Sequence, residues 1–262
     1  MRFAKFSHPT HGTAWGILRG DKLTMLSGHP FAPWRETTTV VLRSEVKLLA
    51  PVEGGDVLAF GRNYKAHAEE SGDTIPKSPL LFIKATSSVT DPDAPIVLPR
   101  VAPSQVDYEA ELAVIIGTTA RHVSPERALD HVFGYTAAND VSARDCQFAD
   151  GQWARGKSFD TFAPLGPWIE TELDPGNVRV QGRLNGNIQQ DANTSLLIFN
   201  IPYLISYLSQ AVTLRPGTVL LTGTPAGCGF ALKPPVYLKP GDVYDVEIQG
   251  IGTLSNPVIA EA

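Results

Sequence analysis

The sequence has little cysteine and no long apolar run. Cys146 and Cys228 are the two cysteines among 262 residues, and they form neither a disulfide framework nor the paired spacing of a zinc site. No apolar window of about 18 residues exists, which argues against a membrane-spanning helix. The segment 1–12 carries no apolar stretch typical of a secretory signal. We therefore expect a cytoplasmic protein without a membrane partner.

Positive charge is also sparse. Lys and Arg number 22 against 27 Asp and Glu, giving a net charge of -5, and no run of basic residues occurs. This balance argues against nucleic-acid binding. Hydrophobic residues make up 43% and charged residues 19% of the chain, as in ordinary globular proteins. The length allows one large domain, or a large domain with a small one.

The first fifty residues predict a small β unit. In the segment 12–28, two apolar runs flank Gly20-Asp21, which is a hairpin signal. A turn at Glu53-Gly54-Gly55 leads into the next apolar segment. We place a small N-terminal β domain at 1–52 and a larger domain at 53–262.

Strands predominate in the larger domain, and helices are fewer. Ser124 can cap a short helix over 125–132, and Asn200 can cap a longer one that ends at 215–217. Because strands and helices do not alternate regularly, a doubly wound sheet and a TIM barrel are disfavoured, and a β-rich α+β fold is predicted. The predicted strands are 56–61, 80–84, 95–98, 107–117, 132–141, 166–172, 178–185, 218–222 and 243–249.

The segment 106–117, VDYEAELAVIIG, places acidic residues inside a core-like strand. Asp107, Glu109 and Glu111 alternate along it and so share one face. Two carboxylates about 5 Å apart repel by roughly 3 kcal/mol at an effective dielectric constant near 20. Protonation, solvent exposure or a bound cation would relieve this repulsion. A solvent-facing edge strand is the alternative, and a third carboxylate, Asp140, is available where a later strand ends, unless it is only a turn residue.

Two further patterns carry possible chemistry. His67 and Glu70 lie three residues apart, on one face if the segment is helical. A carboxylate behind an imidazole suits a general base, although a surface pair, or Glu69 as the partner, is the alternative.

The glycine-rich segment 222–230 does not predict a dinucleotide loop, because prolines follow where a helix is needed. Cys228 within it is interpreted as a packing residue, since no histidine motif accompanies it.

In order along the chain, several segments resemble the fumarylacetoacetate hydrolase family, over about four-fifths of the sequence. The resemblance implies a mixed β-sandwich and β-roll catalytic domain, and many members carry a small N-terminal β domain. The segments are GRNYKAH (61–67), YEAELAVIIG (108–117), GYTAANDVSARDCQ (134–147), GKSFDTFAPLGPW (156–168), IPYLISYLS (201–209), LLTGTPAGCG (220–229) and GIGTLSNPV (250–258).

The resemblance also implies roles for individual residues. Glu109, Glu111 and Asp140 would bind a divalent ion, Mg²⁺ first and Mn²⁺ or Ca²⁺ next, with Asp107 either supporting them or solvated. His67 and Glu70 would activate water, on a lid that continues through about residue 78. Lys157 would act catalytically on the metal-bound substrate, Gln147 would polarise it, and Thr224 would donate to its carboxylate. Apart from the resemblance, we expect Arg62 and Tyr64 to bind near the distal end of the substrate.

The implied reaction is Mg²⁺-dependent hydrolysis of a carbon–carbon bond in an acylpyruvate or related 2,4-dioxo acid, through a metal-stabilised pyruvate enolate. Decarboxylation of oxaloacetate and isomerisation of an unsaturated 2-oxo dioate are the alternatives. An inactive, metal-stabilised binding protein is the alternative from another class. The partner expected is therefore a small 2-oxo acid. The apolar segment 195–208 predicts a homodimer, and members of the family that this chain resembles are commonly homodimers.

Overall fold

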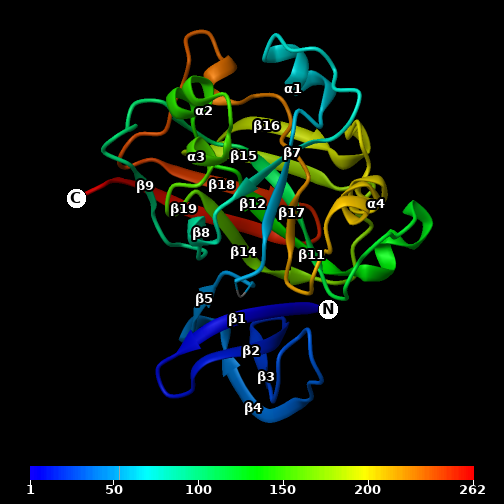
Figure 1. Ribbon diagram of the computed structural model, residues 1–262. Coiled ribbons are helices and arrows are strands. Elements are labelled where there is room, and N and C mark those ends of the chain that lie inside the picture. Colours follow the sequence, from blue (N-terminus) through cyan, green and yellow to red (C-terminus); the bar gives the residue numbers. More distant parts are fainter. Residues whose placement is uncertain (53) are drawn as a thin grey trace.

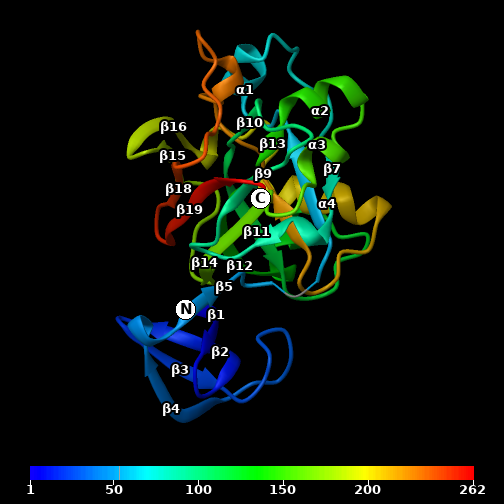
Figure 2. The ribbon, with the colours of Figure 1, turned by 90° about the vertical axis from the view of Figure 1, so that its left-hand side faces the viewer.

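The computed structural model describes residues 1–52 and 54–262, so the turn predicted at Glu53 lies partly outside the described residues. The N-terminal unit lies below the main body in Figure 1, and Figure 2 shows the same separation. Arg19 pairs with Lys22 across Gly20 and Asp21, which confirms the predicted hairpin. The strands of this unit are β1 (Arg2–His8), β2 (Gly12–Arg19), β3 (Lys22–Leu26), β4 (Glu36–Leu42) and β5 (Lys47–Leu49).

The main body is built mostly from strands, as predicted. Of its β-structure, the segments β8, β13, β16 and β19 lie outside the predicted strands. The strands are β6 (Val57–Gly61), β7 (Leu80–Lys84), β8 (Val89–Thr90), β9 (Ile96–Leu98), β10 (Val106–Asp107), β11 (Ala110–Ile116), β12 (Val132–Asn139), β13 (Ser142–Ala143), β14 (Ala163–Glu170), β15 (Arg179–Leu184), β16 (Asn187–Asn193), β17 (Val219–Leu221), β18 (Val243–Ile248) and β19 (Gly252–Ala260).

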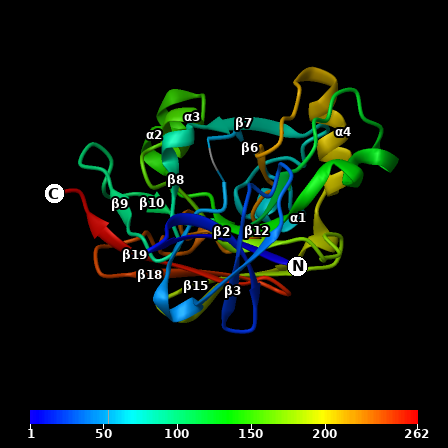
Figure 3. The same cartoon turned by 90° about the horizontal axis from the view of Figure 1, so that it is seen from below.

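Two large sheets organise most of these strands, and β10 and β13 form a third sheet of two strands. The large sheet has the order β4-β3-β2-β1-β14-β12-β11-β17-β6-β7, and the second has the order β16-β15-β18-β19-β9. The view from below shows β15, β18 and β19 along one side of the molecule and β7 along the opposite side (Figure 3). Because Phe3 of β1 pairs with Ile169 of β14, the N-terminal unit continues the large sheet of the main body.

Helices are few and short. Asn200 caps α4 by accepting a hydrogen bond from the backbone N–H of Tyr203 at 3.0 Å, as predicted. The segment Pro125–His131 forms a 3₁₀ helix. Within the described residues, no helix combines the length and apolarity needed to cross a bilayer. The α-helices are α1 (Lys65–Glu70), α2 (Arg144–Asp150), α3 (Ala154–Lys157) and α4 (Ile201–Ala211), and the other 3₁₀ turns are Arg43–Glu45, Thr86–Ser88, Thr194–Leu196 and Gly229–Ala231.

The acidic segment lies at the centre of the large sheet. β11 pairs with β12 on one side and β17 on the other, and all its residues are buried. Leu112 and Val114 join one core cluster, while Ala113 and Ile115 join another, as alternation along a strand requires. The edge-strand alternative is therefore wrong. The predicted strand is also interrupted after Asp107, where β10 pairs with β13 instead.

The Asn200 cap gives a stability test. Asn200→Ala should lower the free energy of unfolding by about 1 kcal/mol, because the Tyr203 N–H loses its side-chain acceptor. Asn200→Ser, which can still cap, should retain most of the stability. Denaturant unfolding of the three proteins measures the difference, and equal losses in both variants would contradict a capping role.

Candidate active site

Three carboxylates converge where β11 and β12 meet. Oxygens of Glu109, Glu111 and Asp140 lie within 4.8 Å of one another, and all three side chains are buried. The Asp140 N–H donates to the Glu109 carbonyl at 2.9 Å, so the antiparallel pairing itself brings the third acid beside the first two. The structure therefore assembles the three acidic residues expected to bind a divalent ion.

Two buried lysines contact this acidic cluster. Lys157 Nζ lies 2.7 Å from Glu109 Oε2 and 2.8 Å from Asp140 Oδ2. Burial alone would lower the pKa of Lys157, but these two carboxylates outweigh it and raise that pKa. Lys84 at the end of β7 lies 2.5 Å from Asp140 Oδ1, and burial lowers its pKa despite that contact. Lys84 was not predicted, although a lysine closing the apolar run LLFIK is a signal that could have identified it.

Arg144 is a second site residue that the sequence did not reveal. Its guanidinium lies 2.8 Å from Asp107 Oδ2 and 2.8 Å from Glu109 Oε1. Asp107 is fully buried, so its solvated alternative is wrong. It also accepts hydrogen bonds from the N–H groups of Gly229 at 2.8 Å and Phe230 at 3.1 Å. Asp107 thus holds Arg144 and the loop around Gly229 in place.

Glu111 lacks the close cation contacts seen for Glu109. Its Oε2 accepts a hydrogen bond of 2.6 Å from the Gly223 N–H. Burial, together with Asp140 and Glu109, raises the pKa of Glu111 well above its ordinary value. In Glu109 the opposite holds, because Lys157 and Arg144 outweigh burial and lower its pKa.

The charges of the cluster do not balance. Its four carboxylates face three cations, so one negative charge remains when all are ionised. A divalent ion would offset that negative charge and leave one positive charge for a bound carboxylate to balance, and hard ions such as Mg²⁺ prefer oxygen ligands. The residues therefore fit the expected ion. The carboxylates are Asp107, Glu109, Glu111 and Asp140, and the cations are Lys84, Arg144 and Lys157.

His67 and Glu70 form the expected pair on α1. His67 Nδ1 lies 2.8 Å from Glu70 Oε1. A carboxylate can only accept, so Nδ1 carries the proton and Nε2 keeps its lone pair. Glu69 instead lies 3.6 Å from Lys65 on the surface, which rules out the alternative partner. The pair has the tautomer that a general base requires.

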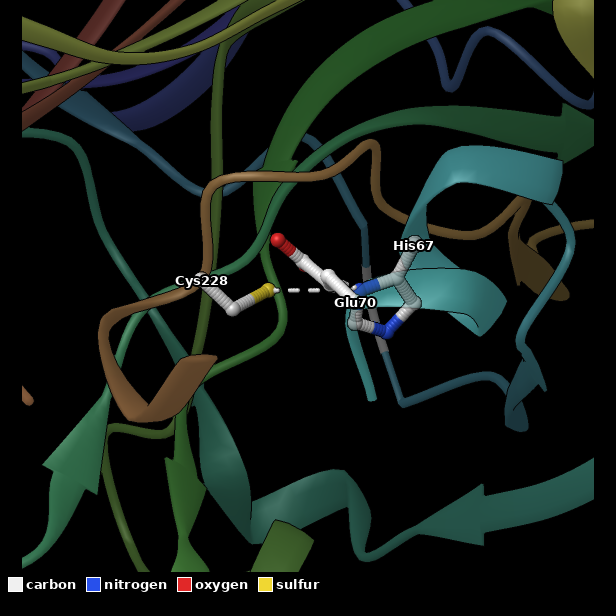
Figure 4. A group of neighbouring side chains, drawn as sticks. All are labelled: His67, Glu70 and Cys228. Atoms are coloured by element: carbon white, nitrogen blue, oxygen red, sulfur yellow. Dashed lines mark hydrogen bonds and ion pairs between the residues drawn. The ribbon is translucent and has the colours of Figure 1, made fainter. Parts of the chain in front are cut away.

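Cys228, interpreted as a packing residue because no histidine motif accompanies it in the sequence, is buried but lies beside a histidine in the structure. Its Sγ lies 3.7 Å from His67 Nδ1, although 161 positions separate the residues in sequence (Figure 4). Burial, with Glu109 and Asp107 nearby, raises the pKa of the Cys228 thiol well above its usual range. A protonated thiol is a poor nucleophile, so Cys228 is not activated for covalent catalysis in this arrangement.

A cavity of about 120 Å³ opens beside these groups. Arg62 lies at this cavity, where its guanidinium forms an ion pair of 2.8 Å with Asp73. Gln147 accepts a hydrogen bond from Arg144 at 2.9 Å. The predicted site residues that line the cavity are Arg62, His67, Glu109, Gln147, Lys157 and Thr224.

Two predicted substrate contacts, Tyr64 and Thr224, have neighbours within the protein, and their contact with a substrate stays a prediction. Tyr64 is buried and borders a separate surface depression, and burial with nearby Glu111 raises its pKa. The Thr224 hydroxyl lines the cavity but donates to the Ala110 carbonyl at 3.0 Å and accepts from Gln190 at 2.7 Å. Thr224 is thus held by two hydrogen bonds within the protein, whereas the buried hydroxyl of Tyr64 has no hydrogen-bond partner among the described residues.

The glycine-rich loop at 222–229 binds protein carboxylates through its backbone. A Cβ at Gly227, whose φ is +107°, would lie 2.0 Å from the Gln189 carbonyl oxygen, so only glycine fits there. No α-helix follows the loop in the described residues, in line with the rejected dinucleotide interpretation. Three N–H groups bind the acids: Gly223 to Glu111, Gly227 to Glu70 and Gly229 to Asp107.

The mixed β fold holds a buried acidic centre and a histidine–carboxylate pair. Together these features indicate that the protein is an enzyme. The family model described as Fumarylacetoacetate (FAA) hydrolase C-terminal matches residues 56–259, and one described as Rv2993c-like, N-terminal matches residues 1–51. The chain therefore belongs to the fumarylacetoacetate hydrolase family.

Individual relatives agree with this assignment. The chain is 40% identical over 269 residues to Protein Rv2993c of Mycobacterium tuberculosis, covering 99% of this chain and 98% of that one. It is 45% identical to "Oxaloacetate tautomerase fahd2, mitochondrial" of Xenopus laevis, covering 84% of this chain and 70% of the relative. The crystal structure of 5-carboxymethyl-2-hydroxymuconate delta-isomerase from Mycobacterium smegmatis superposes with a TM-score of 0.91 at 40% identity, covering both chains fully.

The raised pKa of Glu111 predicts how stability depends on pH when divalent ions are removed. The unfolded glutamate has a pKa near 4.3, and the folded value is higher. The stabilising contribution is complete below about 4.3 and is lost as the pH rises through the folded pKa, by about 1.4 kcal/mol per pH unit between the two values. Chelator-treated protein should therefore melt at lower temperature as the pH rises across this window.

Glu111→Gln is the matched control, since an amide cannot ionise and its oxygen can still accept from Gly223. Added Mg²⁺ should reduce the loss in the wild type. An identical pH profile of melting temperature in the wild type and in Glu111→Gln would contradict this assignment.

Proposed function

We propose that the chain catalyses metal-dependent proton transfer at the carbon beside the keto group of a short 2-oxo dicarboxylate, with keto–enol tautomerisation of oxaloacetate as the reaction. The observation that carries the proposal is the His67–Glu70 pair at the same small cavity as Glu109 and Lys157. The similarity to an oxaloacetate tautomerase and to an isomerase supports it.

Glu109, Glu111 and Asp140 are the proposed ligands of a divalent ion, Mg²⁺ before Mn²⁺ or Ca²⁺. When bound, such an ion supplies Lewis-acid polarisation of the 2-oxo group.

His67 acts as the base in this proposal. Its Nε2 takes the proton from the carbon beside the keto group, and the imidazolium that forms is stabilised by Glu70 at Nδ1. The proton is then delivered to the keto oxygen, which becomes the enol hydroxyl, so no atom is gained or lost. Lys157 and Gln147 at the cavity offer hydrogen bonds to the developing negative charge.

The size and charge of the cavity favour a short substrate with two carboxylates. Its volume of about 120 Å³ falls below the roughly 300 Å³ at which drug-sized pockets begin. Arg62, paired with Asp73 at 2.8 Å, can exchange that partner for a second substrate carboxylate. A four-carbon dioate therefore fits better than a long one.

Hydrolysis of an acylpyruvate is the second candidate, because the same dyad can deprotonate a water molecule. It requires attack of that water on the distal carbonyl and cleavage of a carbon–carbon bond, in addition to stabilising the pyruvate enolate. Decarboxylation of oxaloacetate, by contrast, needs no base, since the electron pair left as CO₂ departs goes onto the 2-oxo oxygen as an enolate, whose negative charge a bound divalent ion would stabilise.

Replacing His67 separates these reactions. His67→Ala should lower the tautomerisation rate of oxaloacetate by roughly 10²–10⁴-fold, because the general base is removed, while decarboxylation should be largely retained. The measurement is ultraviolet absorbance of the enol in Mg²⁺-loaded protein, with CO₂ release followed in parallel. His122→Ala is the matched control, since His122 is exposed and bonds to Gln210, and its rates should equal the wild type.

A panel that includes acylpyruvates and an unsaturated 2-oxo dioate tests the substrate. Faster turnover of an acylpyruvate than of oxaloacetate would replace the leading reaction by hydrolysis. Equal loss of tautomerisation and decarboxylation in His67→Ala would show that His67 positions the substrate and is not the base.

We also propose a homodimer. On α4, Tyr203 and Tyr207 are 42% and 40% exposed, and Leu196 just before the helix is 61% exposed. The rings of Tyr203 and Tyr207 stack at 6.2 Å and form part of an apolar surface that a second copy could cover. Light scattering at micromolar concentration should give the dimer mass, and Tyr203→Lys combined with Tyr207→Lys should shift it toward the monomer. A monomeric wild type would contradict the proposal.

A further inference from the structure

His67, Glu70 and Cys228 form a cluster that the proposed reaction uses only in part. Nδ1 of the histidine, a carboxylate oxygen and Sγ of the cysteine lie within 4.8 Å of one another. Figure 4 shows the thiol directed toward a nitrogen of the His67 ring, and Glu70 Oε1 lies 2.8 Å from the same nitrogen, Nδ1. Cys228 is fully buried, whereas the Glu70 side chain is 19% exposed, so the cluster can be reached from the Glu70 side.

We propose that these three residues form a second cation site, selective for soft divalent ions of the Zn²⁺ type, and that occupation of this site switches off the base. Zn²⁺ takes sulfur at about 2.3 Å and nitrogen at about 2.0 Å, which in a tetrahedron places the two ligand atoms about 3.5 Å apart. The observed separation of Nδ1 and Sγ is 3.7 Å. Glu70 needs only to move outward from its 2.8 Å hydrogen bond.

The ligand types keep the two cation sites distinct. Thiolate and imidazole select Zn²⁺ and Cd²⁺, whereas Mg²⁺ prefers carboxylate and water oxygens. The cluster at Glu109, Glu111 and Asp140 offers oxygens alone. Three protein ligands with an open fourth position also match the ligand number of zinc sites that keep a water.

Ion binding at Nδ1 would change the chemistry of His67. The neutral imidazole carries one proton, now on Nδ1 and directed to Glu70. An ion at Nδ1 displaces that proton to Nε2, while the Cys228 thiol releases its own proton to solvent as the sulfur binds. Nε2 then has no lone pair with which to accept a proton. Inhibition is the expected result, and this part rests on the proposed role of His67.

A spectroscopic titration tests the site without depending on activity. The full-length protein, saturated with Mg²⁺ and kept reduced, is titrated with Cd²⁺, and the ultraviolet charge-transfer absorbance of a cadmium–thiolate bond is recorded. One equivalent should produce the band in the wild type and in Cys146→Ser, the matched control for the other buried cysteine. Cys228→Val, which preserves the packing volume, should abolish the band.

Glu70→Gln provides a variant that keeps both cysteines. It should weaken Cd²⁺ binding at least tenfold, because the amide lacks the carboxylate charge. Absence of the band in the wild type, its persistence in Cys228→Val, or unchanged affinity in Glu70→Gln would each overturn the proposed site.

The effect on catalysis is measured as a ratio within each variant, with and without Zn²⁺ at constant Mg²⁺. Zn²⁺ should inhibit the wild type and Cys146→Ser at least tenfold more than Cys228→Val. If the cadmium band behaves as expected but this ratio does not change with Cys228, the site stands and its inhibitory role is wrong. If no substrate is turned over, the titration still decides the site, and the proposed function alone fails.

Discussion

Burial of several carboxylates in one place is the constraint on which the arrangement of this molecule depends. An unpaired buried charge costs several kcal/mol, so each acid must receive a partner from another element. Arg144 is carried by α2, Lys157 by α3 and Lys84 by β7. Each of these three short elements contributes one cation to the acidic cluster. The two sheets supply the rigid frame that holds such distant segments together.

The parts of the site encoded locally could be predicted from the sequence. His67 and Glu70 are separated by about one helical turn, and Glu109 directly precedes the strand that carries Glu111, so the members of each pair are close in sequence as well as in space. Assigning Asp140 as the third ligand of the ion required the family resemblance. The buried cations could not be found in this way. Lys84 lies 56 positions from Asp140, and no local pattern encodes an ion pair across such a distance.

The secondary structure, too, could be predicted where a local pattern encodes it and not where distant segments impose it. Apolar runs bounded by turns predict β6, β7 and β18 to within about two residues, which is the usual accuracy of element boundaries. β19 contains Pro257, which disfavours a strand locally, yet pairing with β18 and β9 imposes the extended form. The residues of the N-terminal unit predict its hairpin by themselves. Its union with the main sheet depends on β14, far along the chain.

The loop at 222–229 binds the carboxylates of the site through backbone N–H groups. The side chain of Cys228 takes no part in these hydrogen bonds. The N–H groups of Gly223, Gly227 and Gly229 bind the acids whichever side chain stands at position 228. A small residue there faces the histidine without carrying any of those bonds. Position 228 is therefore a place where a change of side chain can alter the surroundings of His67 while the buried carboxylates keep their backbone hydrogen bonds, so that a response to the environment can evolve separately from the acidic centre.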